Sequence, residues 1–252
     1  MTIDTPAAAG PTELWLVRHG ESTANVAASR ADREGAEVIR VDHRDPDVPL
    51  SDTGKAQARA LGRWLASRSD VPTAVWSSHY LRARSTAAVA LAEARIDVEV
   101  RPDERLRDRE LGILDLLTSH GVAARHPDED DRRRWLGKLS YRPPGGESWA
   151  DVALRIRSFL QDPEVESADG RALITTHDAV VMLFLYVCLG LTEAELLAFQ
   201  AQHTVANASV TILERSAPRG RWTLRTFSAT EHLDGQGAPV TEHGGEPDVR
   251  GR

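Results

Sequence analysis

The sequence contains a single cysteine, Cys188, among its 252 residues. One thiol excludes a disulfide within the chain, and its place inside an apolar run indicates a buried side chain. The longest apolar run, residues 179–189, is shorter than the about 18 residues that a membrane span needs, and predicts a buried helix. Residues 1–11 lack the basic flank and apolar stretch of a secretory signal. We therefore expect a soluble cytoplasmic protein.

Basic residues are in the minority, because 31 lysines and arginines face 38 aspartates and glutamates and give a net charge of −7. Nucleic-acid-binding proteins generally present a basic face, so we expect no nucleic-acid partner and no membrane partner. The histidines at 203, 232 and 243 lack the spacing of a metal site, and we expect no metal. An anionic small molecule remains compatible, since a local cluster of arginines can bind it within an acidic protein.

Runs typical of strands alternate with runs typical of helices along the chain. Strands are expected at 14–17, 73–78, 96–100, 171–176, 208–213 and 221–226. Helices are expected from about 21 to 29, at 55–69, 80–94, 117–125, 128–139 and 147–161, and after residue 177. This alternation predicts an α/β fold with a mostly parallel sheet that helices cover on both faces.

The same pattern predicts how the chain is divided. Residues 1–12 are expected to form a flexible leader, and residues 13–227 a single domain. A helical insertion at about 113–147 is expected to lie over the strand ends and the active site. Residues 228–252 are rich in glycine, proline and charge. Because they offer little to bury, we expect a disordered tail.

Polar side chains follow three of the expected strands. Arg18 and His19 follow the first, either Arg82 or Arg84 follows the second, and His177 follows the fourth. Ligands collect where the carboxyl ends of parallel strands meet at one edge of a sheet. Two arginines and two histidines at that edge suit a phosphoryl group, because arginine offers a planar fork to its oxygens. One such dipeptide alone is weak evidence, and the agreement of three strand ends strengthens it.

This set of side chains indicates covalent phosphoryl transfer. The neutral imidazole of His19 would attack phosphorus while the alcohol leaves. A nearby carboxylic acid must protonate the leaving oxygen and then activate water. The candidates for this acid lie together after the third expected strand: Asp103, Glu104, Asp108 and Glu110.

Four ordered motifs lie in these strand-end contexts. They are RHGES with Asn25 at 18–25, SS, LRA and TA within 77–87, LRDRELG at 106–112, and TTH at 175–177. Together with LSDTGKAQA at 50–58, they resemble the motifs of the histidine phosphatase superfamily, also called phosphoglycerate mutase-like. The resemblance extends from about residue 13 to about residue 226 and implies a doubly wound α/β sheet.

The resemblance implies a role for each matching residue. His19 would be the phosphorylated nucleophile, and Asp108 would be the general acid and then the general base. Arg82, rather than Arg84, would be the arginine of the second motif. The groups implied to bind the substrate are Arg18, Ser22, Asn25, Arg82 and His177. Of these, Arg18, Arg82 and His177 are also implied to be catalytic. No metal and no organic cofactor is implied.

The sequence departs from the family pattern in two places. The family acid is often glutamate, and Asp108 is one methylene shorter, so Glu110 remains a competitor for that role. Many members have glycine after the second histidine, whereas Asp178 follows it here. Asp178 would either orient the histidine or cap the next helix.

We expect a phosphatase that hydrolyses a small phosphomonoester through a phosphohistidine. The alternatives are a phosphoglycerate mutase and a phosphoprotein phosphatase. The mutase branch has tyrosine and asparagine where this chain has Leu111 and Ala179, which favours the phosphatase. Arginines 132–134 are either a charged helix face or a grip for a second acidic group, which keeps the mutase open. The insertion indicates a covered site and a small substrate. The sequence identifies neither the substrate nor the pathway, and it is compatible with a homodimer.

Overall fold

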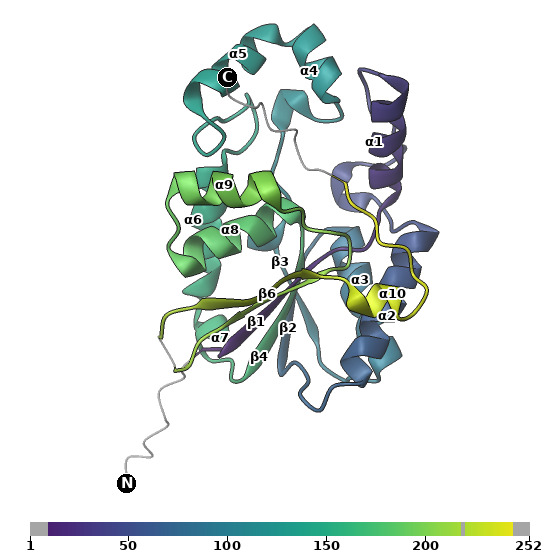
Figure 1. Ribbon diagram of the computed structural model, residues 1–252, viewed down its shortest axis with the longest axis vertical. Helices are drawn as coiled ribbons and strands as arrows, with labels where there is room; N and C mark the ends of the chain where they lie inside the picture. Colours follow the sequence, from purple (N-terminus) through teal and green to yellow (C-terminus); the bar gives the residue numbers. More distant parts are fainter. Residues whose placement is uncertain (1–9, 218–219, 244–252) are drawn as a thin grey trace.

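A computed structural model describes residues 10–217 and 220–243 (Figure 1). Within these residues one sheet of six strands has the order β3-β2-β4-β1-β5-β6. The strands are β1 (Glu13–Arg18), β2 (Ala74–Ser78), β3 (Val100–Asp103), β4 (Arg171–Thr176), β5 (Val210–Glu214) and β6 (Thr223–Ala229). The first four run parallel, and β5 and β6 are antiparallel to their neighbours. The predicted mostly parallel sheet is confirmed.

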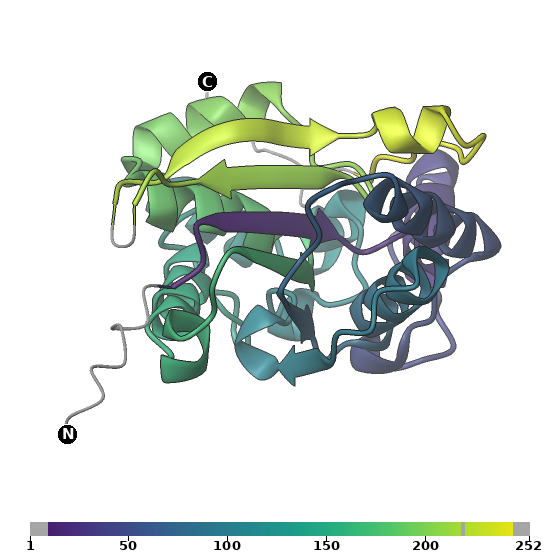
Figure 2. The same cartoon turned by 90° about the horizontal axis from the view of Figure 1, so that it is seen from below.

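Helices cover both faces of this sheet, with α2 and α3 on one side and α6 and α8 on the other (Figures 1 and 2). The α-helices are α1 (Thr23–Glu34), α2 (Asp52–Ala66), α3 (Leu81–Ala94), α4 (Ser119–Arg125), α5 (Pro127–Leu136), α6 (Trp149–Leu160), α7 (Pro163–Glu166), α8 (Asp178–Leu189), α9 (Glu193–Gln202) and α10 (Glu231–Asp234). Short 3-10 helices are η1 (Asp45–Asp47), η2 (Glu104–Leu106) and η3 (Gly112–Leu114). Among these residues, no helix combines the length and apolarity that crossing a bilayer requires.

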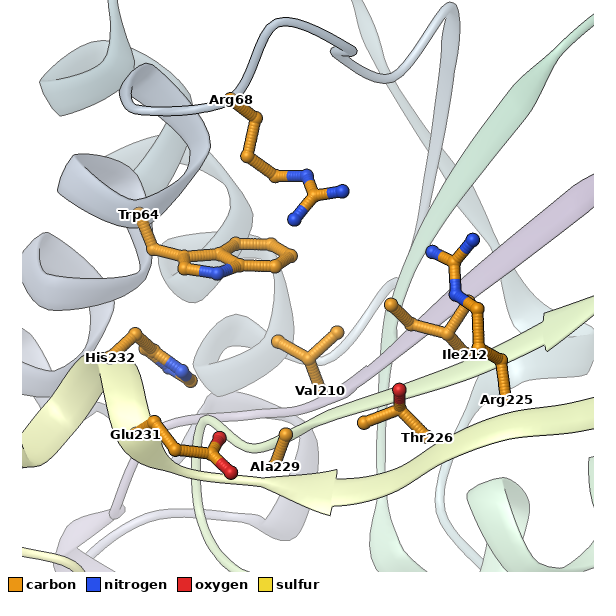
Figure 3. Close-up of a pocket in the computed structure, with 9 residues that line it drawn as sticks. All are labelled: Trp64, Arg68, Val210, Ile212, Arg225, Thr226, Ala229, Glu231 and His232. Carbon is orange, nitrogen blue, oxygen red and sulfur yellow. The ribbon is translucent and has the colours of Figure 1, made fainter.

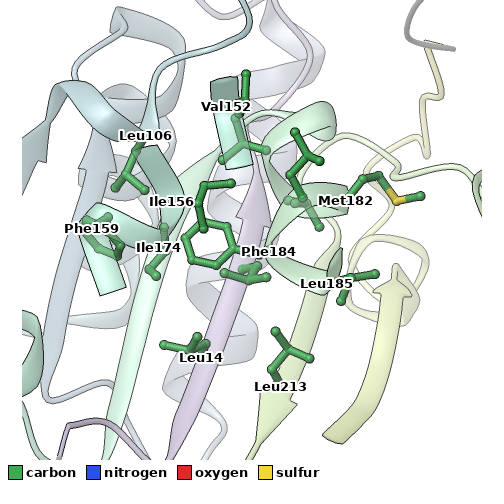
Figure 4. Close-up of a cluster of buried hydrophobic side chains, with 14 of the residues drawn as sticks. Leu14, Leu106, Val152, Ile156, Phe159, Ile174, Met182, Phe184, Leu185 and Leu213 are labelled. Atoms are coloured by element: carbon green, nitrogen blue, oxygen red, sulfur yellow. The ribbon is translucent and has the colours of Figure 1, made fainter. Parts of the chain in front are cut away.

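Strand β1 shows why both faces are covered. Leu14 and Leu16 belong to the core beneath α6 and α8, whereas Trp15 and Val17 belong to the core beneath α2. Successive side chains of a strand point to opposite faces, so four consecutive apolar residues require cover on both sides. Figure 4 shows Leu14 in the first of these cores, which also contains Phe184 of α8.

Strand β3 and helix α9 differ from the expectation. Strand β3 begins at Val100, four residues later than the start of the predicted run 96–100, because the ladder with β2 pairs Val75 with Val100. Ile96 and Val98 are partly buried against the core, so their alternation reflects packing without ladder bonds. Helix α9 was not expected, although Thr192 and Glu195 form the capping box that marks its start.

The predicted insertion at 113–147 contains α4 and α5, which stand beyond the carboxyl end of β1 (Figure 1). A bridge between Val38 and Leu117 joins it to the segment after α1. Thr118 adds a hydrogen bond from its backbone N–H to the carbonyl of Glu37, at 3.1 Å. The insertion is therefore tied to the segment that follows the first motif.

The predicted disordered tail is wrong for residues 228–243. Strand β6 extends to Ala229, and α10 follows it. Leu233 is fully buried and Ala238 nearly so, in a small cluster with Ala60 and Ala208. Small residues on α2 leave room for this tail, which its own composition does not reveal. Residues 244–252 lie outside the described part.

The predicted flexible leader lies outside the described residues over positions 1–9. Residues 10–12 are held by backbone hydrogen bonds. Gly10 donates to Glu166 at 2.7 Å, and Thr12 donates to Gly170 at 2.8 Å. The start of the described chain is therefore fixed against α7 and the turn that precedes β4.

Replacing Leu233 with alanine is expected to lower the free energy of unfolding by about 2–5 kcal/mol, because it leaves a cavity at a fully buried site. Urea denaturation measures this change. Val240→Ala in the same tail is the control, since Val240 is 39% exposed, and should change stability by less than about 0.5 kcal/mol. Equal, small effects of both substitutions would contradict a packed tail.

Candidate active site

His19 lies directly after β1 and is almost completely buried. Its Nδ1 is 2.7 Å from the carbonyl oxygen of Gly20. A carbonyl can only accept, so Nδ1 carries the ring proton and donates it, which leaves a lone pair on Nε2. Gly20 allows this turn because a Cβ there would lie 2.6 Å from the carbonyl oxygen of Gly54. The fold therefore fixes one tautomer of His19.

The pKa of His19 is held well below its ordinary value. Burial is the main cause, and the nearby charges of Arg82, His177 and Arg18 act in the same direction. Only the hydrogen bond to Gly20 opposes them. The imidazole is therefore neutral at neutral pH, which is the state that a nucleophile requires.

Arg82, in the first turn of α3, lies at the centre of the predicted residues and is 4% exposed. Its Nε is 3.3 Å from Nε2 of His19, and its Nη2 is 3.2 Å from Oδ2 of Asp108. Its Nη1 donates to Asp45, at 2.7 Å to the backbone oxygen and 2.8 Å to Oδ1. Arg84 is exposed, so the structure places Arg82 beside the histidine and Arg84 on the surface.

His177 follows β4 and is completely buried. Its ring centroid is 5.1 Å from that of His19, edge to face. Its Nε2 lies 2.9 Å from the hydroxyl of Ser78, and its Nδ1 lies 3.2 Å from Oδ2 of Asp108. Burial lowers the pKa of His177, partly opposed by the charge of Asp108. Ser78 ends β2 and belongs to the second motif, and these were the two sequence signals for its place in the site.

Asp108, and not Glu110, lies beside these groups. Burial alone would raise the pKa of Asp108, but the charges of His177 and Arg82 hold it well below its ordinary value. Glu110 instead accepts a hydrogen bond from the hydroxyl of Tyr80 at 3.0 Å, and its side chain is 48% exposed. Asp108, although it is one methylene shorter than Glu110, is therefore the acid that contacts Arg82 and His177.

Arg18 is buried at the end of β1. Its Nη1 donates to the backbone oxygen of Val205 at 2.5 Å and to that of His243 at 3.2 Å. Asn207 donates to the backbone oxygen of His19 at 3.0 Å. Sequence reasoning missed Val205, His243 and Asn207 because no motif marks them and each comes from the last third of the chain.

Ser22 and Asn25 form the capping box that begins α1. The hydroxyl of Ser22 donates to Oδ1 of Asn25 at 3.0 Å, and the backbone N–H of Asn25 donates back to that hydroxyl at 3.1 Å. The structure thus gives both predicted substrate contacts a role in starting the helix beside His19.

Two open alternatives are narrowed by further contacts. The carboxylate of Asp178 accepts from the backbone N–H of Ala179 at 2.7 Å, which is a role at the start of α8. In the three-arginine run, Arg134 pairs with Asp130 at 2.7 Å and with Asp131 at 2.9 Å on an exposed helix face. Arg134 is therefore engaged with its own helix.

A separate hollow of about 560 Å³ lies between α2, α10 and the outer strands β5 and β6 (Figure 3). Its apolar lining includes Trp64, Val210 and Ile212. Its arginines are engaged, Arg68 with Asp70 and Arg225 with the carboxylates of strands β1 and β5. None of the predicted site residues lines it. The described residues also contain no cluster of three or more potential metal ligands.

Comparison with known proteins identifies the family of this chain. The sequence matches the histidine phosphatase superfamily (branch 1) over residues 14–230. It is 36% identical to the 2,3-bisphosphoglycerate-dependent phosphoglycerate mutase 2 of Gloeobacter violaceus, over 68% of this chain and 73% of that protein. It is 30% identical to the corresponding mutase of Methylobacterium radiotolerans, over 82% of this chain and 98% of that protein.

Among solved structures, a mycobacterial glucosyl-3-phosphoglycerate phosphatase with inorganic phosphate superposes with a TM-score of 0.66 at 27% identity. The match covers 88% of this chain and 99% of that one. A protein described as mycobacterial hydrolase 1 also has a TM-score of 0.66, at 29% identity, over 87% and 99% of the two chains. With a family match that spans most of its length, the chain belongs to the histidine phosphatase superfamily.

Proposed function

We propose that the protein is a phosphatase that hydrolyses a small phosphomonoester through a phosphohistidine at His19. One observation carries this proposal: Nε2 of His19 is unprotonated and faces the guanidinium of Arg82, with His177 and Asp108 beside them. A neutral nucleophile next to a fixed cation is what an attack on a phosphoryl group needs.

A buried donor supports an anionic ligand at this position. Nε of Arg18 is buried and has no hydrogen-bond partner among the described residues. Buried polar groups are ordinarily satisfied, so such a donor favours a ligand that supplies acceptors. Phosphoryl oxygens would do so, since Arg18, Arg82 and His177 lie around His19.

In the first half of the reaction, a bond forms between Nε2 of His19 and phosphorus while the ester P–O bond breaks. Asp108 gives the leaving oxygen its proton. Because the pKa of Asp108 is low in the resting site, the proton either arrives on the monoanion of the substrate or is taken up from solvent by Asp108 when the dianion binds and raises its pKa. In the second half, Asp108 accepts a proton from water, whose oxygen displaces His19 and releases inorganic phosphate.

A phosphoglycerate mutase is the second candidate, favoured by relatives of that name at 36% and 30% identity. A mutase must return the phosphoryl group to a carboxylate-bearing acceptor and so needs a cation for that carboxylate. Leu111 and Ala179 stand where the mutase branch has tyrosine and asparagine, and Arg134 pairs with its own helix. We therefore propose the phosphatase as the first candidate.

Steady-state turnover of a phosphomonoester panel decides between the two. The panel includes 3-phosphoglycerate and its 2,3-bisphosphate. We expect release of inorganic phosphate from at least one small ester, with little interconversion of the phosphoglycerates. Mutase turnover far above hydrolysis would overturn the phosphatase assignment, and no turnover of any ester would overturn both.

A further inference from the structure

Asp45 is a carboxylate placed on the arginine of the candidate site. It lies in η1, within the loop between α1 and α2. Its Oδ1 and its backbone oxygen both accept from Nη1 of Arg82, at 2.8 and 2.7 Å. Nothing in the catalytic scheme uses this carboxylate.

The guanidinium of Arg82 has two sides with different neighbours. Nε and Nη2 face His19 and Asp108, whereas Nη1 faces Asp45. A phosphoryl group on Nε2 of His19 would therefore bind at the first side and leave Asp45 where it is. Asp45 would then remain beside the alcohol part of the substrate, which leaves when the phosphoryl group is transferred.

Two further carboxylates lie near Asp45. Burial raises the pKa of Asp115, and the charges of Asp45 and Glu110 raise it further, with Arg82 opposing them. The same two charges, after burial, raise the pKa of Tyr80, whose ring lies 4.9 Å from the guanidinium carbon of Arg82. Asp45, Asp115 and Glu110 thus act on the same small region around Arg82.

The cations nearby are each shared between two carboxylates. Arg82 is shared between Asp45 and Asp108. Arg107 lies 3.6 Å from Glu110 but only 2.6 Å from Glu147, which is its main partner. A dianionic phosphoryl group would also be bound by the charges of Arg82 and Arg18. The carboxylates would then face the rest of the substrate.

We propose that Asp45 selects the substrate by charge, admitting phosphate esters of neutral or cationic alcohols and disfavouring those whose alcohol carries a carboxylate. This inference rests on the proposed function. A substrate carboxylate would meet Asp45, Asp115 and Glu110, and like charges brought together across a binding site reduce affinity. A cationic alcohol would instead find partners in the same side chains.

The test compares kcat/KM for three small esters: phosphoethanolamine, glycerol 1-phosphate and 3-phosphoglycerate. The wild-type protein should prefer the first two over 3-phosphoglycerate by about tenfold or more. Asp45→Asn should narrow that ratio by about tenfold, because it keeps the shape of the side chain and removes its charge. Asp47→Asn is the matched control, since Asp47 lies in the same 3-10 helix and pairs with exposed Arg44.

Three outcomes would overturn the proposal. Preference for 3-phosphoglycerate in the wild-type protein would contradict it, while turnover of an aryl phosphate would keep the proposed function standing. An equal change in kcat/KM for all three esters in Asp45→Asn would show that Asp45 acts on Arg82 alone. Absence of turnover with every ester would remove the proposed function and this inference together. Asp115→Asn should shift the ratio in the same direction, and thermal unfolding verifies that each variant is folded.

Discussion

The variant His19→Ala should be inactive, with turnover reduced by about 10⁴-fold or more. Alanine removes the atom that would form the bond to phosphorus, and no other described imidazole has the same surroundings. Nε2 of His19 faces Arg82, whereas Nε2 of His177 is engaged by Ser78. Brief mixing of the protein with a ³²P-labelled ester, followed by quenching in base, measures an acid-labile label on the wild-type chain that the variant should lack.

His203→Ala is the matched control for this experiment. His203 stacks on Phe199 at the end of α9, outside the candidate site, and its ring is exposed. It should keep both turnover and label. An acid-labile label that persists in His19→Ala would refute His19 as the nucleophile, and loss of both signals in His203→Ala would point to a general failure to fold.

Asp108→Asn should slow the hydrolysis of alkyl phosphates by about 10²–10⁴-fold, the range that general acid–base catalysis contributes. An alkoxide leaves poorly without a proton, whereas an activated phenolate leaves without help. The first step with p-nitrophenyl phosphate should therefore be affected much less. Pre-steady-state release of p-nitrophenol measures that step, and phosphate release from glycerol 1-phosphate measures the alkyl reaction.

Glu110→Gln separates the two candidate acids. Glu110 is half-exposed and holds the hydroxyl of Tyr80, so its amide variant should keep most of the activity toward alkyl esters. If Glu110→Gln loses alkyl activity while Asp108→Asn keeps it, the acid is Glu110. Equal losses on alkyl and aryl esters in Asp108→Asn would contradict a role as proton donor.

The local part of this molecule could be predicted from its sequence. Four apolar residues of β1 followed by Arg18 and His19 predict a buried strand that ends in polar groups, and the structure has it. The same logic brought together His19, Arg82 and His177, because parallel strands end at one edge and place their following residues side by side. The choice between Asp108 and Glu110 needed coordinates, since both lie in one short segment.

The rest depends on contacts between segments far apart in the chain. Asn207 and His243 lie 188 and 225 positions from their partners His19 and Arg18, and neither sits in a motif. Leu233 is one apolar residue in a polar tail, and only the small residues opposite it make burial possible. The composition of the tail alone predicts little burial, because the space that Leu233 fills is formed by small residues of other elements.

The tail also changes where the working unit of this protein ends. The family match stops at residue 230, yet the backbone oxygen of His243 accepts from Arg18 and Thr241 accepts from Gln57 and Asn207. A version trimmed to the matched residues would keep every recognised motif. It would lose the contacts that the tail makes with Arg18, at the carboxyl end of β1, and with Gln57 and Asn207. For expression or domain grafting, a boundary at His243 or beyond therefore keeps these contacts.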